Sequence, residues 1–234
     1  MRTIAENLSE IERVNWNVVD TVSESSVFML QIREKLPKLC EPIALCIAAE
    51  YFQYFCSTLF HEIFEKFFFH VLRIRRINEF GAQQLLLDCQ DLENLLSSIP
   101  GLRVYKDEKD TRRVQKSIGK VLKKEVGKIV ILLKSVAASA SLVGETFRTL
   151  TRNGSLSDLL RIMDLKGMKR SEQQSVVDAY NLKVPPTQQA PPMFKLVEPT
   201  SVVPMSDMGL RDITEAKQAL LREASKLFVD KKKI

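Results

Sequence analysis

Residues 42–76 read PIALCIAAEYFQYFCSTLFHEIFEKFFFHVLRIRR, and this stretch decides the fold. Its apolar residues recur at intervals of four, a period typical of an α-helix. They are Ile43, Ile47, Tyr51, Phe55, Leu59, Ile63, Phe67 and Val71, and phenylalanines fill the adjacent faces. A helix that is apolar on nearly all sides belongs at the centre of a bundle. We therefore predict one long helix over 42–76 with Pro42 in its first turn. Core packing is a better explanation of the aromatic side chains than a ligand pocket.

The segments around this helix show the same period. It predicts further helices over 3–13, 20–36, 78–98, 107–136, 142–151, 155–165 and 171–180. Pro37 is expected to end the second of these, because proline breaks the hydrogen-bond ladder of a helix. Ser155 is a candidate N-cap with Asp158 three residues later, and Gly167 is expected to supply a left-handed turn. The predicted fold class is all-α, an elongated stack of antiparallel helices.

The composition changes after residue 182. Six of the nine prolines lie between Pro185 and Pro204, which is typical of an extended linker. We predict a helical bundle or rod over 1–182, a proline-rich linker over 183–208, and a C-terminal helix over 209–234 that ends in a basic tail. The most apolar run, 51–60, is too short to span a membrane, which takes about 20 residues.

Residue types that carry chemistry are few and poorly spaced. His61 and His70 are nine residues apart, which does not match the metal-ligand spacing of three or four on a helix. Cys56 and His61 are five apart, so a thiolate–imidazole pair would need a kink. The other cysteines, Cys40, Cys46 and Cys89, also lie in apolar sequence and suit a reduced core. We expect no catalytic residue, metal ligand, cofactor or small-molecule substrate.

The sharpest physical signal is a run of basic residues over 106–134. It holds ten Lys or Arg and four Asp or Glu, a net charge of +6, which equals that of the whole chain. At 100° per residue most of these side chains fall on one side of a helix, opposite Val114, Ile118 and Ile129. The basic stripe comprises Lys109, Arg112, Arg113, Lys116, Lys120 and Lys123. It is either a solvated face or a contact for an acidic partner or anionic lipid, and it lacks the interleaved aromatic residues of a nucleic-acid site.

Two segments resemble a known family. Residues 81–100 read GAQQLLLDCQDLENLLSSIP and residues 160–173 read LRIMDLKGMKRSEQ. Both are similar to the C-terminal region of the family of vacuolar protein sorting subunit fifty-three, a subunit of the Golgi-associated retrograde protein (GARP) complex and the related EARP complex. The likeness spans about 20–182. The family's N-terminal coiled-coil region has no counterpart in the sequence, so we expect a fragment or a truncated product.

The resemblance implies a non-enzymatic helical-rod subunit that tethers carriers from endosomes to the trans-Golgi network, with a related role in endocytic recycling. It implies a cytoplasmic protein, peripheral at Golgi and endosome membranes. Its implied partners are other tethering subunits, with membrane-fusion proteins as further candidates and no nucleic acid. The candidate contact residues are the basic stripe together with Lys169 and Arg170 near Gly167. The alternatives are a generic helical adaptor whose basic face binds acidic partners or anionic lipid, and a helical enzyme.

Overall fold

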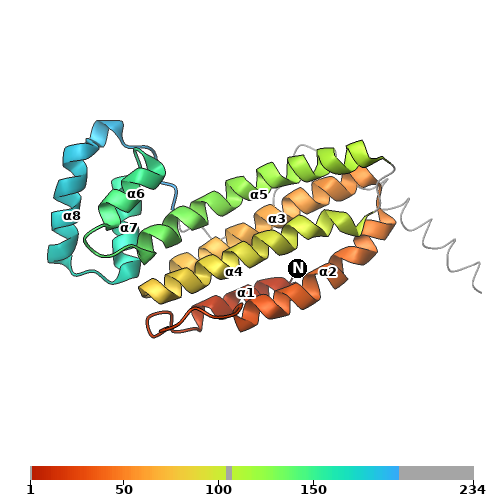
Figure 1. The fold of residues 1–234 in the computed structure, drawn as a ribbon, viewed down its shortest axis with the longest axis horizontal. Coiled ribbons are helices and arrows are strands. Elements are labelled where there is room, and N and C mark those ends of the chain that lie inside the picture. Colours follow the sequence, from red (N-terminus) through yellow and green to blue (C-terminus); the bar gives the residue numbers. More distant parts are fainter. Residues whose placement is uncertain (1, 104–106, 195–234) are drawn as a thin grey trace, which may run out of the picture. The chain divides into compact units, whose positions relative to one another are not determined.

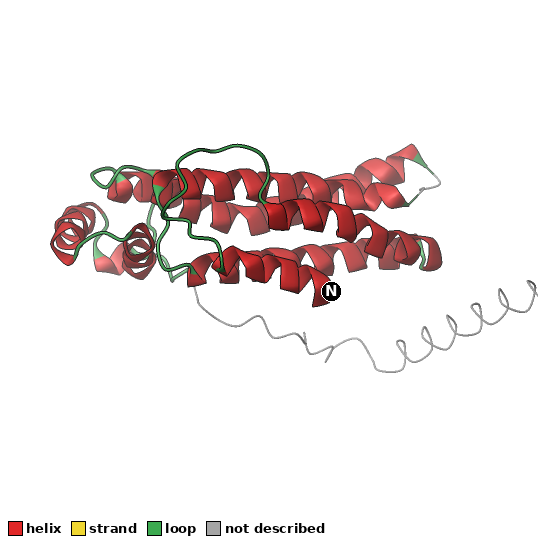
Figure 2. Cartoon of the chain, turned by 90° about the horizontal axis from the view of Figure 1, so that it is seen from below, coloured by secondary structure: helices red, strands yellow, loops and turns green. Residues whose placement is uncertain are grey.

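The computed structural model describes residues 2–103 and 107–194, and the described residues form helices and loops without a strand (Figures 1 and 2). The α-helices are α1 (Arg2–Ser9), α2 (Val27–Cys46), α3 (Ala49–Arg73), α4 (Glu79–Ser98), α5 (Glu108–Ala137), α6 (Val143–Thr151), α7 (Leu156–Lys166) and α8 (Arg170–Lys183). Three short 3-10 helices are η1 (Glu10–Glu12), η2 (Ile99–Leu102) and η3 (Pro186–Gln188). The prediction of an all-α fold is confirmed.

Helices α2 to α5 lie side by side, each antiparallel to the one before it in the chain (Figure 1). Helix α5 packs against both α3 and α4, and α1 packs against α2 and α3. Short connections favour antiparallel neighbours, because the chain has no length to cross the bundle. The predicted stack of antiparallel helices is therefore confirmed for these elements.

The core centres on the aromatic side chains of α3. Phe52, Phe60, Phe64 and Phe67 are each no more than 1% exposed. Burial of a phenylalanine side chain contributes about 1.5–3 kcal/mol, so this row is a major source of stability. The helix is not apolar all round, however, because Tyr51 is 63% exposed. The expectation that Tyr51 would be buried is wrong.

The prolines do not divide the second and third helices as the sequence suggested. Helix α2 runs through both Pro37 and Pro42, and the break falls at Ile47, whose backbone is extended. A buried stripe continues across both prolines, through Met29, Ile32, Leu36, Cys40 and Ala44. Burial of that stripe outweighs two lost backbone hydrogen bonds, and the freed carbonyls belong to Arg33 and Lys38, which are exposed residues. The predicted helices 20–36 and 42–76 are therefore wrong in their boundaries.

A distant arginine fixes where α2 ends. The guanidinium of Arg103, which follows η2, donates hydrogen bonds to the backbone carbonyls of Ala44 and Ile47. The last carbonyls of a helix have no partner within the helix, and a cation there also favours the helix dipole. Arg103 therefore satisfies the end of α2 and lets a new helix begin at Ala49.

The start of α2 is fixed by a buried carboxylate on α4. Asp88 is fully buried. Its two oxygens accept hydrogen bonds from the backbone N–H of Ser26, at 2.8 Å, and from the Ser26 hydroxyl, at 2.6 Å. Burial raises the pKa of Asp88, although both hydrogen bonds from Ser26 oppose that shift. Asp88 thus joins α4 to the first turn of α2.

Helices α6, α7 and α8 pack together beside the C-terminal part of α5 (Figure 1). The boundaries predicted for α4 to α7 agree with the structure to within one residue, and Ser155 caps α7 as expected. Asp158 has a different role from the expected one. Its oxygens accept hydrogen bonds from the backbone N–H groups of Met193 and Phe194, at 2.8 and 2.9 Å.

These contacts bear on the start of the predicted linker. Val184 is 2% exposed and Phe194 is 9% exposed, so residues 184–194 bury side chains against the bundle despite their prolines. Phe194 lies against Phe68 and Phe147, with ring centroids 5.8 and 6.5 Å away. The rest of the predicted linker and the predicted helix over 209–234 lie outside the described residues. None of the described helices combines the length and the apolar character of a membrane span.

Candidate functional site

The basic stripe lies along the N-terminal half of α5, and all six of its residues are exposed. The opposite side of the helix is buried, with Val114, Ile118, Leu122, Val126 and Ile129 between 0% and 8% exposed. Packing against α3 and α4 holds that side in place. The stripe is therefore presented to solvent on a fixed helix.

Acidic neighbours offset only part of the charge of the stripe. Arg112 pairs with Glu108 at 2.6 Å and Arg113 with Asp110 at 3.7 Å, both on the helix surface. Lys109, Lys116, Lys120 and Lys123 have no ion pair with any residue that the structure describes. Exposed pairs within a helix are worth only a few tenths of a kcal/mol. The four lysines are thus free to meet an external anion.

Lys169 and Arg170 lie at the turn between α7 and α8, away from the stripe in the chain and on different elements. Gly167 adopts the left-handed conformation there, with φ 75° and ψ 27°, as predicted. Arg170 contacts Gln173 at 3.0 Å and Asp164 at 3.8 Å. The Glu172 carboxylate accepts from the backbone N–H of Lys169, at 2.9 Å. Both basic side chains are exposed, and no hydrogen bond or ion pair joins them to the stripe within the described residues.

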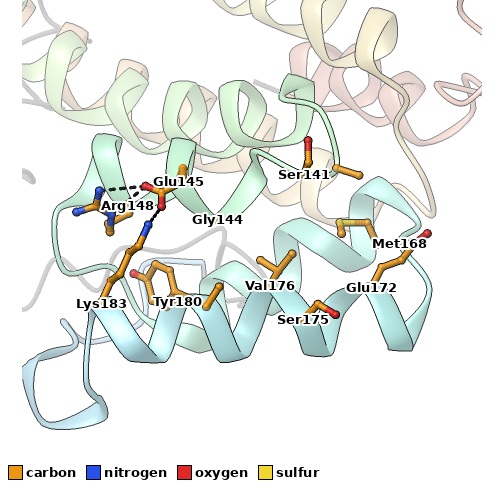
Figure 3. A pocket seen from close by; sticks show the side chains of 12 residues that line it. Ser141, Gly144, Glu145, Arg148, Met168, Glu172, Ser175, Val176, Tyr180 and Lys183 are labelled. Atoms are coloured by element: carbon orange, nitrogen blue, oxygen red, sulfur yellow. Dashed lines mark hydrogen bonds and ion pairs between the residues drawn. The ribbon is translucent and has the colours of Figure 1, made fainter.

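A groove between α6 and α8 begins beside this turn (Figure 3). Its volume is about 460 Å³, and its floor is mostly apolar, with Met168, Val176 and Tyr180 among the lining residues. Gly144 on α6 permits the close approach of the helices, because a Cβ there would lie 3.0 Å from a methyl group of Val176.

The polar groups of the groove already have partners within the fold. At one end Glu145 pairs with Arg148, at 3.0 Å, and with Lys183 (Figure 3). The Tyr180 hydroxyl donates to the carbonyl of Gly154, at 2.8 Å, and burial raises the pKa of Tyr180. A hydroxyl in this state is a poor proton donor or acceptor for a substrate. The groove suits contact with an apolar surface better than proton transfer.

One cluster of metal-ligand types was missed by the sequence reasoning. His61 and Glu65 on α3 and Glu125 on α5 place their donor atoms within 4.8 Å of one another. The four-residue spacing of His61 and Glu65 is the signal in the sequence that could have revealed the cluster. Glu125 is a charged residue on the apolar side of α5, which in the sequence also indicates a buried polar site.

Comparison with known proteins supports the resemblance to the family of vacuolar protein sorting subunit fifty-three. Residues 83–168 match the family model described as Vacuolar protein sorting-associated protein 53 C-terminus. Vacuolar protein sorting-associated protein 53 A of Arabidopsis thaliana is 29% identical over 174 residues, covering 74% of this chain and 20% of the relative. The Caenorhabditis elegans homolog of Vacuolar protein sorting-associated protein 53 is 29% identical over 179 residues, covering 76% of this chain and 22% of the relative.

The chain therefore spans about a fifth of the length of these curated relatives. No solved structure gives a significant match. The predicted resemblance is confirmed, and the family match contains α5 with the whole basic stripe.

Proposed function

We propose that the chain, whose residues 83–168 match the family model described as Vacuolar protein sorting-associated protein 53 C-terminus, serves as a non-enzymatic subunit, or part of one, of a vesicle tethering complex. The proposed process is retrograde transport from endosomes to the trans-Golgi network, with a related role in endocytic recycling. The observation that carries the proposal is the exposed basic stripe of α5, which lies inside the family match. It acts as a contact surface for acidic protein or anionic membrane.

The physics of the stripe favours reversible attachment. Each basic residue near an anionic membrane surface contributes about 1 kcal/mol. Arg112 and Arg113 contribute less, because each already has an acidic neighbour. The exposed side of α5 offers no row of large apolar residues along the stripe, so it lacks the apolar face that interfacial helices insert. A tether that must release its carrier is suited by attachment of this kind.

The turn and groove at α6–α8 supply a second contact surface in this proposal. Lys169 and Arg170 lie beside an apolar groove in which Glu145 pairs with Arg148 and Lys183. We propose that the turn and groove at α6–α8 contact other subunits of the complex, with membrane-fusion proteins as further candidate partners. The proposed location is cytoplasmic, peripheral at trans-Golgi and endosome membranes.

The test is a comparison of two charge-reversed variants of the full chain. The stripe variant changes Lys109, Lys116, Lys120 and Lys123 to Glu. The control variant makes the same change of net charge at exposed sites on other elements: Arg13, Lys38, Arg75 and Arg152 to Glu. Both should keep the helix content of the parent by circular dichroism, since all eight side chains are exposed.

The chain and each variant are then recovered from cells, and the proteins that accompany them are identified. We expect the parent and the control variant to carry tethering subunits and to fractionate with Golgi and endosome membranes, and the stripe variant to lose one or both. A parent that brings down no tethering subunit would favour the generic helical adaptor. If the stripe variant recovers the same tethering subunits and fractionates with the same membranes as the parent, the basic stripe is only a solvated face.

A further inference from the structure

The cluster of His61, Glu65 and Glu125 joins α3 to α5. His61 and Glu65 are four residues apart, so their side chains lie on one face of α3. Glu125 reaches the same point from α5, and the donor atoms of all three lie within 4.8 Å of one another. Two ligands from one helix turn and a third from a packed neighbour is a common way to build a metal site.

The spacing of the atoms agrees with a shared metal ion. His61 Nδ1 and Glu125 Oε1 are 3.3 Å apart. In a tetrahedral zinc site the metal lies about 2.0–2.2 Å from nitrogen and oxygen ligands, which sets neighbouring ligands about 3.3–3.5 Å apart. The pair therefore already has the separation that one zinc ion would impose.

Glu125 supplies the most buried carboxylate of the cluster. Its side chain is only 7% exposed, and its sole described partner is His61. That partner is cationic only when its ring holds a proton, whereas a neutral imidazole offers a lone pair to a metal. A buried carboxylate is costly unless it is paired and hydrogen-bonded. The other buried carboxylates, Asp88 and Asp158, each accept two hydrogen bonds, and Glu125 accepts none from the described residues.

We propose that His61, Glu65 and Glu125 bind a zinc ion that ties α3 to α5. One imidazole and two carboxylates are ligands that zinc accepts, and they leave a position for water. A thiolate from the same helix takes no part, because burial raises the pKa of Cys56 to about 12. Lys128, whose Nζ lies 3.4 Å from Glu65 Oε1, holds that carboxylate when no metal is present.

Titration calorimetry with zinc chloride on the full chain tests the site. The measurement is made in a Cys46→Ser background, because Cys46 is an exposed thiol and a thiolate is itself a zinc ligand. We expect saturable binding of one zinc ion per chain. His61→Ala and Glu125→Gln should each weaken that binding by more than tenfold. The matched control is His70→Ala, because His70 meets one carboxylate, Glu12, at 2.6 Å, and that carboxylate is also paired with Arg73.

Thermal melting supplies a second readout. Zinc should raise the melting temperature of the background protein and of His70→Ala, and leave His61→Ala and Glu125→Gln unchanged. If Glu125→Gln fails to fold, His61→Ala decides the matter, since that side chain is 49% exposed. An absence of zinc binding, or binding that survives loss of His61, would overturn the proposal. The zinc-binding result does not depend on whether the chain recovers tethering subunits from cells, so the two proposals can fail separately.

Discussion

The buried carboxylate of Asp88 on α4 stabilises the protein by holding the start of α2. In Asp88→Ala the backbone N–H and the hydroxyl of Ser26 lose their acceptors at the start of α2. A buried donor without a partner costs about 1–3 kcal/mol. Part of this is offset because the variant no longer buries a charge. We expect a net loss of about 2 kcal/mol, or about 4–8 °C in melting temperature for a chain of this size.

Asp88→Asn separates the hydrogen bonds from the charge. The amide oxygen can accept from the Ser26 N–H, and the amide nitrogen can donate to the Ser26 hydroxyl oxygen. We expect the free energy of unfolding of this variant to lie within about 1 kcal/mol of that of the parent, because the Ser26 donor keeps a partner. Urea unfolding followed by circular dichroism measures all three proteins. Equal losses in the Ala and Asn variants would refute the hydrogen-bond reasoning.

The pH dependence of the same pair has a definite sign. The folded pKa of Asp88 is raised from its ordinary value of 3.8, mainly by burial. At a pH between the ordinary pKa and the raised pKa, Asp88 keeps its proton in the folded protein and has released it in the unfolded chain. Stability from this group is therefore complete below pH 3.8 and is lost as pH rises through the folded pKa. The free energy of unfolding of the parent, minus that of Asp88→Asn, should fall across that window. A difference that grows with pH would contradict the assignment.

Further predictions concern the end at α6–α8 and the thiols. Replacing Lys169 and Arg170 with Ala should change stability by less than about 1 kcal/mol, because exposed pairs are weak; a large fall in melting temperature would show a structural role. Phe194→Ala should cost about 3 kcal/mol in urea unfolding, because the ring packs on two others. Gly167→Ala should cost about 1 kcal/mol in the same assay, because φ is 75°. Of the four cysteines, Cys46 alone should react quickly with a thiol reagent near neutral pH, since the others are buried, and Cys46→Ser should abolish the fast phase.

The helix ends of α4, α5 and α7 were predicted correctly because the residues that determine them lie close by in the sequence. Asn78 and Asp107 cap α4 and α5 with their own side chains, and Gly167 ends α7 in a left-handed turn. Each of these signals acts within three residues of the helix end. The amphipathic period of α5 likewise placed every residue of the basic stripe on the exposed side.

The failures share a cause, which is a partner far away in the chain. The end of α2 depends on Arg103, which lies beyond η2 in the sequence. The nearby prolines at 37 and 42 therefore gave the wrong boundary for this helix. Asp158 holds the backbone of Met193 and Phe194, so proline-rich sequence became a packed segment. Glu125 meets His61 only because α3 packs on α5. None of these pairings follows from spacing along the sequence.

Flotation with liposomes tests the basic stripe most directly. The full chain, the stripe variant and the control variant are each mixed with liposomes that contain or lack anionic lipid. We expect the parent and the control variant to float with anionic liposomes at low salt. That binding should fade as the Debye length shrinks to about 8 Å at physiological ionic strength and below it at higher salt. The stripe variant should remain unbound. If it floats as well as the parent, or if the parent binds neither anionic liposomes nor an acidic tethering subunit at low salt, the stripe is only a solvated face.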